Sequence, residues 1–313
     1  MRVLVVGARG FVGVALTGEL LRRGHSVTAI EVRGDKGRLT PLADRIDWVT
    51  GDCADPEVIL GAIGRDGVDA VYYGPYYRSP SAAKNLHAEF QVMGVGALNI
   101  FNLTRALGIR RVVFPSSTAV HGIQDAGSAP VHELSRVRPF GVYGATKLAC
   151  EYLAAEVNED LGRNAVTSVR LPSIYGPGAD IASRKVNVLA VQAARGNVGQ
   201  VDYVPDARVC IAHVADTAHF LADLMEAAEV RHDVYELGGL SVTFGAIAQA
   251  VSQAVPDARH QFGTDTLSPL PSEVDWSRAR GEFALTHRDL ADGMASIVAY
   301  ERARAAGREA VRP

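Results

Sequence analysis

The sequence predicts an α/β fold in which helices cover both faces of a doubly wound parallel sheet, followed by a smaller C-terminal lobe. An apolar run at residues 3–6 leads through glycines into a helical pattern. Apolar runs of strand length then alternate with helical patterns up to residue 171, and a Pro- and Gly-rich segment at residues 172–178 ends that alternation. Continuous apolar strands separated by helices are typical of parallel sheets buried on both faces.

The first strand and the helix after it are joined by Gly7, Gly10 and Gly13. Glycines at this spacing permit a tight turn, a close approach of backbone N–H groups to a pyrophosphate, and close packing of helix on sheet. The helical pattern begins at Phe11 and ends at Gly24. Because strand, loop and helix occur together, we interpret the segment as a dinucleotide-binding loop rather than a plain turn.

The second strand, at residues 27–31, ends in Glu31, eighteen positions after Gly13. At this place a carboxylate can accept hydrogen bonds from the adenosine ribose hydroxyls, so the sequence predicts NAD. Glu31 would repel the extra phosphate of NADP, although Arg9 and Arg33 are close enough in sequence to neutralise it. A solvated Glu at a strand end is the alternative, and the spacing disfavours it.

Two later strand ends leave alternatives open. The strand at residues 46–50 is followed by Asp52, which either reaches the adenine amino group or caps the helix that Asp55 and Pro56 begin. The strand at residues 69–73 enters a loop at 74–78 that is rich in Gly, Pro and Tyr. Its tyrosines either touch a ligand or pack against neighbouring side chains.

The candidate catalytic residues are Ser117, Tyr143 and Lys147. Ser117 ends an apolar strand at residues 112–117, where a doubly wound sheet presents groups to its ligand crevice. Tyr143 and Lys147 are four residues apart on a helix that runs to about residue 161, so they share one face. A neighbouring ammonium favours the phenolate, which makes Tyr143 the expected acid/base.

Composition excludes several classes. Forty-eight per cent hydrophobic residues with 21 per cent charged ones indicate a globular chain, and a net charge of −3 gives no electrostatic case for nucleic acid or an anionic membrane as partner. Cys53, Cys150 and Cys210 lack metal-ligand spacing and an even count, so we expect no metal site and no disulfides. The apolar run after Met1 is too short for a signal peptide or membrane span, so the sequence predicts a cytoplasmic protein.

We expect two lobes. Residues 1–171 form a cofactor-binding domain, to which segments near 209–238 return, and residues 172–313 form mainly a substrate-binding lobe. A long helical pattern at 82–107 has an apolar outer face that predicts a dimer surface. Several basic side chains meet either an anionic group of a substrate or solvent: Arg78, Lys84, Arg184, Lys185 and Arg208.

Together these motifs resemble the extended short-chain dehydrogenase/reductase superfamily, in particular its NAD-dependent epimerase/dehydratase family. The likeness covers nearly the whole chain. It rests on Gly7, Gly10 and Gly13, on Asp52, on Ser116-Ser117 with Val120 and Gly122, on Tyr143 with Lys147, on Arg170 with Tyr175-Gly176-Pro177, and on His213-Val214 with Asp216.

The resemblance implies a Rossmann-type fold, an NAD-dependent enzyme and a homodimer formed by the helices at 82–107 and 143–161. Ser117 and Tyr143 would hold the reacting hydroxyl, Lys147 would bind the nicotinamide ribose, and the backbone after Leu171 would pack near the nicotinamide. The residues expected to bind the cofactor are Gly7, Arg9, Gly10, Phe11, Val12, Glu31, Arg33, Asp52, Cys53, Gly74, Lys147, Leu171 and Ser173.

Departures from the family pattern bear on the substrate. Ser173 stands where an Asn commonly touches the diphosphate of a nucleotide sugar, which argues against a sugar-nucleotide substrate. Thr118 and Ala119 stand where dehydratases carry an acidic pair, so sugar dehydration is disfavoured. Other departures are Pro75 and Tyr76 in place of alanines, Met93 in place of Asn, and His121 in place of Tyr.

The predicted function is hydride transfer between NAD and a secondary alcohol of a small molecule, a sugar or sugar nucleotide, with epimerisation as the first choice. Two alternatives stay open. One is a simple dehydrogenase or reductase of a small hydroxy compound that carries no nucleotide. The other is a protein that binds NAD or NADP only to sense it. His121 and Glu133 are expected to have structural roles.

Overall fold

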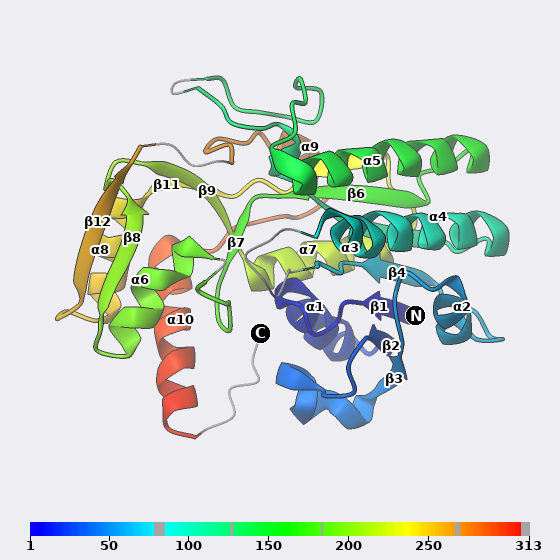
Figure 1. Ribbon diagram of the computed structural model, residues 1–313, viewed down its shortest axis with the longest axis horizontal. Coiled ribbons are helices and arrows are strands. Elements are labelled where there is room, and N and C mark those ends of the chain that lie inside the picture. Colours follow the sequence, from blue (N-terminus) through cyan, green and yellow to red (C-terminus); the bar gives the residue numbers. More distant parts are fainter. Residues whose placement is uncertain (78–84, 126–127, 183, 267–269, 308–313) are drawn as a thin grey trace. The chain divides into compact units, whose positions relative to one another are not determined.

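The computed structural model describes residues 1–77, 85–125, 128–182, 184–266 and 270–307 (Figure 1). The chain divides into two compact units. The first comprises Met1–Val120, Arg138–Arg170 and Ala218–Tyr235. The second comprises His121–Val137, Leu171–Thr217 and the residues from Glu236 onward.

A seven-stranded sheet forms the centre of the first unit, and its strands follow one another in the spatial order β10 (Val234–Glu236), β6 (Val166–Leu171), β5 (Arg111–Ser117), β4 (Ala70–Tyr73), β1 (Arg2–Val6), β2 (Ser26–Glu31) and β3 (Ile46–Thr50). The pairs of β1 with β2 and β4, of β2 with β3, and of β4 with β5 are parallel. Because the order reverses at β1 and β4, the carboxyl ends of these two strands form the switch point of a doubly wound sheet. The fold class predicted from the sequence is confirmed.

Helices cover this sheet: α1 (Phe11–Arg22), α2 (Pro56–Ile63), α3 (Leu86–Phe90), α4 (Gly96–Leu107), α5 (Gly141–Leu161) and most of α7 (Val214–Glu226), with 3₁₀ turns at Gly37–Arg45 and Thr118–Val120. In Figure 1, α4 runs beside α5, and the two helices pack against each other. The core between α2, α4, α5 and the sheet includes the fully buried Leu4, Val112 and Phe114 from the strands and Ile100 and Phe101 from α4. Each such side chain contributes roughly 1.5–3 kcal/mol by leaving water.

The helix predicted at residues 82–107 is interrupted, and residues 82–84 lie outside the described residues. A π-helical turn at Gln91–Val95 separates α3 from α4, and the N–H of Gly96 donates to the carbonyl of Gln91, five residues back. The buried Tyr73 hydroxyl donates to the carbonyl of Val92 at 2.6 Å, and a Cβ at Gly96 would collide with that hydroxyl. A side chain from β4 therefore takes a carbonyl that an α-helix would have used.

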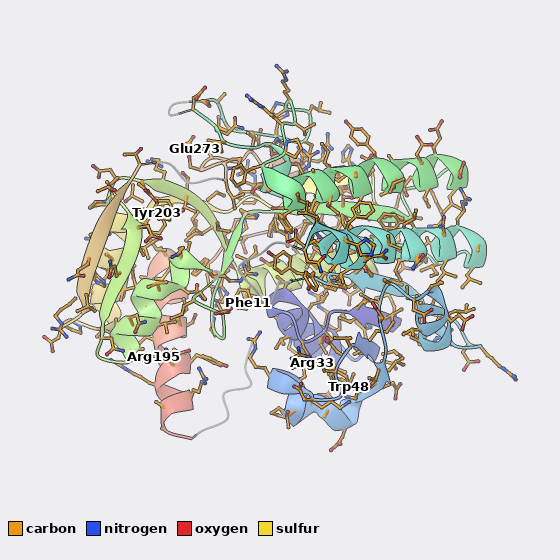
Figure 2. The ribbon with its side chains drawn as sticks, in the orientation of Figure 1. Phe11, Arg33, Trp48, Arg195, Tyr203 and Glu273 are labelled. Atoms are coloured by element: carbon orange, nitrogen blue, oxygen red, sulfur yellow. The ribbon has the colours of Figure 1, made fainter. Side chains whose placement is uncertain are left out.

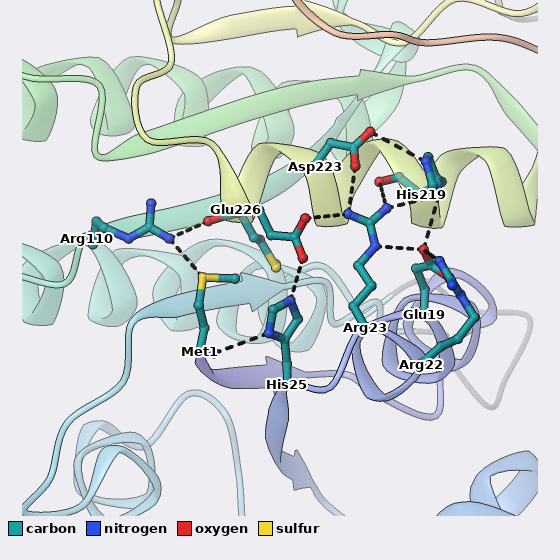
Figure 3. Close-up of polar contacts among 10 residues, drawn as sticks. Met1, Glu19, Arg22, Arg23, His25, Arg110, His219, Asp223 and Glu226 are labelled. Atoms are coloured by element: carbon teal, nitrogen blue, oxygen red, sulfur yellow. Dashed lines mark hydrogen bonds and ion pairs between the residues drawn. The ribbon is translucent and has the colours of Figure 1, made fainter.

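A half-buried arginine joins α1 to α7 (Figure 3). Arg23 donates from Nε to Glu19 and from Nη1 to Asp223 and Glu226, each at 2.7 Å. Burial opposes the charged guanidinium, yet these carboxylates raise the pKa of Arg23 above its ordinary value. We call Arg23, Glu19, Asp223 and Glu226 the Arg23 cluster; it ties together helices about 200 residues apart in the sequence.

The second unit contains a three-stranded sheet in the order β11 (Leu240–Thr243), β9 (Arg208–His213), β7 (Ser173–Tyr175), and a parallel pair of β8 (Val198–Tyr203) and β12 (Arg259–Asp265). Its helices are α6 (Lys185–Ala194), α8 (Phe244–Ala254), α9 (Ser277–Glu282) and α10 (Leu290–Ala305). Helices α6, α8 and α10 pack together around Leu189, Ile247 and Ile297.

Two contacts of the second unit involve residues labelled in Figure 2. The ring of Tyr203 stacks on Phe244 with centroids 4.5 Å apart, and Arg195 at the end of α6 pairs with Glu301 of α10 at 2.8 Å. They fix β8 on α8 and α6 on α10. Within the described ranges, no helix combines the length and the apolar character needed to cross a membrane.

Most predicted elements appear at their expected places, with ends that differ by a few residues. The segment at 172–178, which was expected to end the alternation of strands and helices, contains the short strand β7 that the sequence did not predict. The alternative in which Asp52 caps α2 is wrong. Asp55 caps that helix by accepting from the N–H of Glu57, while the Asp52 carboxylate accepts from the N–H of Ala54 inside the preceding turn.

Candidate active site

The glycine loop lies at the switch point of the sheet. Gly7 has a φ of +83°, and a Cβ there would lie 3.0 Å from the nitrogen of Pro75, in the loop after β4. A Cβ at Gly13 would collide with the carbonyl oxygen of Gly7. Gly10 precedes the first turn of α1, where no side chain accepts from the helix N–H groups. Gly7 and Gly13 leave no room for a side chain, and a Cβ at Gly10 would lie 3.1 Å from the carbonyl oxygen of Gly7. The helix N-terminus presents its N–H groups as a phosphate-binding loop requires.

A carboxylate borders this loop. Glu31, at the end of β2, accepts a hydrogen bond from the backbone N–H of Arg9 at 2.7 Å. Burial raises the pKa of Glu31, while the Arg9 N–H lowers it. The Arg9 guanidinium pairs with Asp35 at 2.5 Å, so its charge is already balanced. This arrangement favours a ligand with free ribose hydroxyls over one with a phosphate at that position.

The other predicted cofactor residues of the first unit border the same strand ends. Phe11, labelled in Figure 2, begins α1 and is half-buried, and Val12 beside it is buried. Arg33, also labelled there, is exposed just beyond β2. Gly74 donates its N–H to the carbonyl of Val6 at 3.0 Å, which joins the ends of β4 and β1.

Tyr73, the last residue of β4, and Tyr76, in the loop after it, both pack against neighbouring side chains. Tyr73 is buried, and its hydroxyl lies 3.5 Å from the sulfur of Cys53, so it packs in the core beside a predicted cofactor residue. Tyr76 is 63% exposed and meets the ring of Tyr143 edge to face, with centroids 5.6 Å apart. Tyr76 therefore covers one side of the proposed acid/base.

The end of β5 and the start of α5 meet closely. Ser117 is buried, and its Oγ accepts from the N–H of Ala119 at 3.2 Å. The carbonyl of Ala119 accepts from the N–H of Phe140, just before α5, and a Cβ at Gly144 would lie 2.7 Å from that oxygen. The glycine next to Tyr143 thus allows the first turn of the helix to approach the residues that follow Ser117.

Lys147 is buried, and its ammonium lies over two aromatic rings. Nζ is 4.5 Å from the centroid of Phe114 and 5.7 Å from that of Tyr143. Among the residues that the structure describes, no carboxylate lies within ion-pair distance of it. Burial lowers the pKa of Lys147 to about 8, against the opposing effects of Cys150 and Glu151. A half-buried phenol and a cation whose pKa lies near neutrality therefore share one face of α5.

A buried polar group that the sequence reading did not assign lies one turn further along α5. Glu151 accepts from the Ser116 hydroxyl at 2.5 Å and from Arg170 of β6, with Nη2 at 2.7 Å and Nε at 3.0 Å. All three residues are less than a tenth exposed. The sequence did carry a signal for this group. Glu151 follows Lys147 by four residues, which places its carboxylate on the same buried face of the helix.

The remaining predicted residues belong to the second unit. Leu171 ends β6, and Ser173 begins β7, where it pairs with Ile211 of β9. Their part in cofactor binding remains a prediction. His121 contacts Glu236 at 2.6 Å, with both side chains fully buried, and Glu133 accepts from the N–H of Glu236. These hydrogen bonds fit the structural roles expected for His121 and Glu133.

The model of the NAD dependent epimerase/dehydratase family matches residues 3–238. The chain belongs to this family. A UDP-glucose 4-epimerase of Corynebacterium glutamicum is 29% identical over 296 residues, which cover 89% of this chain and 84% of that protein. A 2-alkyl-3-oxoalkanoate reductase of Stenotrophomonas maltophilia is 29% identical over 236 residues, which cover 71% of this chain but only 65% of that protein.

A solved structure has the same fold. The UDP-glucose 4-epimerase of Thermus thermophilus, in complex with NAD, superimposes with a TM-score of 0.81 at 23% identity, covering 96% of this chain and 99% of that one. The protein is thus an NAD-dependent enzyme of the extended short-chain dehydrogenase/reductase type. Its glycine loop, uncapped helix N-terminus and ribose-side carboxylate fit that cofactor.

Proposed function

We propose that this enzyme is an epimerase that oxidises a secondary alcohol of a sugar-like substrate and re-reduces the ketone on its other face. The observation that carries the proposal is the shared face of α5, where Lys147, buried and without an ion-pair partner among the described residues, lies beside Tyr143. The match of the chain to a UDP-glucose 4-epimerase over most of both lengths supports the choice of epimerisation.

In the proposed reaction, Tyr143 removes the proton from the substrate hydroxyl as a phenolate, and Ser117 donates a hydrogen bond to the same oxygen. NAD, when bound, accepts the hydride from the carbinol carbon and can return it to the ketone. Lys147 supplies a positive charge that favours the phenolate and orients the ribose side of the cofactor. When the ketone is reduced, Tyr143 returns the proton to the oxygen.

The cofactor is proposed to lie along the strand ends of the first unit. The N–H groups of the glycine loop and of the first turn of α1 would hold the pyrophosphate, and Glu31 would accept from the adenosine ribose hydroxyls. Asp52 and Cys53 would border the adenine, while Leu171 and Ser173 would contact the nicotinamide side. The second unit would supply most of the substrate contacts.

A second candidate is a dehydrogenase or reductase of a small hydroxy compound without a nucleotide. Ser173, which replaces an Asn that would touch a nucleotide diphosphate, favours it, as does the similarity to a 2-alkyl-3-oxoalkanoate reductase. In this case the ketone leaves the site and reduced cofactor is released. A role in sensing NAD is less favoured, because the Tyr143 and Lys147 arrangement would then have no purpose.

Incubation with UDP-sugars and with small secondary alcohols separates the two enzymes. An epimerase converts a UDP-sugar to its epimer without a net change in NADH absorbance, and chromatography measures the conversion. A dehydrogenase accumulates NADH in step with ketone. Net NADH formation from a non-nucleotide alcohol, with UDP-sugars unchanged, contradicts the epimerase.

We also propose a homodimer formed through the α4 and α5 face. Large apolar side chains are exposed on these two helices and on the neighbouring α3, namely Leu86 and Phe90 of α3, Leu107 of α4, and Tyr152 and Leu153 of α5. A second copy covering them would remove this apolar area from water. Sedimentation of the wild type as a dimer and of Tyr152→Lys as a monomer would support this surface; a wild-type monomer would exclude it.

We propose the cytoplasm as the place of action. Cys53, Cys150 and Cys210 are all free thiols, as is usual in a reducing compartment. Imaging of the tagged protein in its own cells tests this, and a signal outside the cytoplasm would contradict it.

A further inference from the structure

Glu151 continues the face of α5 that carries the proposed catalytic residues. Tyr143, Lys147 and Glu151 are spaced by four residues, so their side chains follow one another along the helix. The Glu151 carboxylate is buried, a position that costs stability unless its charge and its lone pairs are satisfied. This carboxylate is satisfied by contacts to two different strands.

The first contact joins Glu151 to the strand that carries Ser117. The Ser116 hydroxyl donates to Glu151 at 2.5 Å, and Ser116 is the neighbour of Ser117 on β5. A hydrogen bond to a carboxylate is short and strong. It fixes the end of β5 on α5 and so fixes the distance between Ser117 and the helix with Tyr143 and Lys147.

The second contact balances the charge of Glu151. Arg170 donates from Nε and Nη2 in the two-pronged geometry that suits a guanidinium and a carboxylate. Ion pairing spreads the charge of the carboxylate without removing it. The Glu151 carboxylate, held in this ion pair, lies one helical turn from Lys147.

Other groups near Lys147 do not supply this negative charge. Burial raises the pKa of the Cys150 thiol to about 11, so that group is neutral in ordinary conditions. Phe114 of β5 offers only its ring face, Tyr143 is the group that Lys147 serves, and Arg170 of β6 carries a like charge. Among the described residues, Glu151 is the carboxylate whose charge supports the ammonium of Lys147.

We propose that Glu151, anchored by Ser116 and Arg170, is a positioning residue that holds the end of β5 against α5 and keeps Lys147 charged beside Tyr143. The inference rests on the proposed function insofar as Lys147 is taken to be a working group. Its electrostatic part concerns Lys147 alone. It is therefore measurable without substrate.

Two substitutions separate the charge of Glu151 from its hydrogen bond. Glu151→Gln keeps the shape of the side chain, removes the negative charge and leaves Arg170 as an unbalanced cation nearby. Both changes disfavour the ammonium, so Lys147 should lose its proton at a pH lower by about one unit. Ser116→Ala removes one hydrogen bond and keeps the charge, so the titration of Lys147 should move by no more than a few tenths of a unit.

The sequence makes the titration simple, because its lysines are Lys36, Lys84, Lys147 and Lys185. NMR of the full chain labelled with ¹³C-lysine follows each side chain against pH, and Lys147→Arg assigns the signal. Circular dichroism and NAD binding confirm that each variant is folded. The rate against pH, measured with a turned-over substrate, should show the alkaline decline moving in the same direction as the Lys147 titration.

If Glu151→Gln leaves the midpoint pH of the Lys147 titration unchanged, the inference is overturned. The inference is also overturned if Ser116→Ala shifts that midpoint as much as Glu151→Gln does. Should Glu151→Gln not fold, Glu151→Gln with Arg170→Gln removes both charges at once. The midpoint pH of the Lys147 titration should then still be lower than in the wild type, and an unchanged midpoint overturns the inference. If the NMR shift appears but no substrate is oxidised, the proposed function fails while the role of Glu151 stands.

Discussion

Two cations of the first unit, the half-buried Arg23 and the buried Lys147, have opposite surroundings. Arg23 contacts three carboxylates at 2.7 Å, and these raise its pKa. Lys147 lies over two aromatic rings with no carboxylate in ion-pair range among the described residues, and burial lowers its pKa to about 8. The first cation is always charged, whereas the second can change its charge near neutral pH.

The difference separates structural from chemical use of charge. A cation that is paired with carboxylates holds the elements that carry them together, and its role is to stabilise the fold. A buried cation whose charge is only weakly supported keeps its field available to a neighbouring group, here the phenol of Tyr143. The comparison predicts that substitutions in the Arg23 cluster change stability, and that substitutions around Lys147 change the rate.

The largest effect is expected at Tyr143. Replacement of Tyr143 by Phe removes the acid/base and should lower kcat about a thousandfold, which corresponds to about 4 kcal/mol of activation free energy. Tyr76→Phe is the matched control, because Tyr76 packs on the same ring and keeps its own ring in the variant. Steady-state kinetics measure both. Equal losses in the two variants would mean that packing, not proton transfer, is affected.

The next largest effect is expected in the Arg23 cluster. Arg23→Met leaves three carboxylates without their shared partner and should lower the free energy of unfolding by about 3 kcal/mol, while kcat of the folded fraction stays near the wild type. Arg22 pairs with the same Glu19 from an exposed position, so Arg22→Met should change stability little. Urea denaturation measures both. A large drop in kcat for Arg23→Met would contradict a purely structural role for Arg23.

The carboxylates also divide between groups that stabilise the fold and groups that act on a ligand, and Glu31 belongs to the second kind. Burial raises the pKa of Glu31, and its carboxylate accepts a hydrogen bond from the backbone N–H of Arg9 rather than pairing with a guanidinium as Glu19 does. Glu31→Gln should weaken NAD binding about tenfold, or about 1.4 kcal/mol, through weaker hydrogen bonds to the ribose. Asp35→Asn, which removes a charge beside Arg9, should change it about twofold at most. Calorimetry measures both, and a reversed order would reject Glu31 as the ribose ligand.

The smallest effect is the dependence of stability on acid at Glu19. Hydrogen bonds from Arg22 and then Arg23 outweigh burial and lower the pKa of Glu19 from 4.5 to about 2. This contribution to stability is complete above pH 4.5 and is lost as the pH falls through about 2. The stability difference between the wild type and Glu19→Gln should therefore shrink on acidification, by about 1 kcal/mol after solvent screening. A constant difference between about pH 5 and about pH 2 would contradict it.

Local sequence signals predicted the parts of the site that depend on spacing. Gly7, Gly10 and Gly13 act within one strand, loop and helix, and Tyr143 with Lys147 act within two turns of one helix. Such patterns carry their own geometry, because helix and strand periods fix which side chains share a face. The seven-stranded sheet followed from the same kind of signal, the apolar runs of its strands.

Features that depend on contacts between distant segments were not predictable in this way. The π-helical turn before Gly96 depends on the Tyr73 hydroxyl of β4, and the Glu151 contacts join residues from β5, α5 and β6. The four-residue spacing from Lys147 places Glu151 on the buried face of α5, but nothing in the nearby sequence identifies Ser116 and Arg170 as its partners. The short strand β7 has only three residues between Pro and Gly, too few for a periodic pattern.

The dependence of the oxidation rate on pH shows whether the charge of Lys147 acts on Tyr143. We expect the wild-type rate to decline above a pH of about 8, as Lys147 loses its proton. In Lys147→Arg, whose guanidinium stays charged, any remaining activity should show no decline in that range. A wild-type rate that stays constant well above that pH, or the same decline in Lys147→Arg, would show that the charge of Lys147 does not support catalysis by Tyr143.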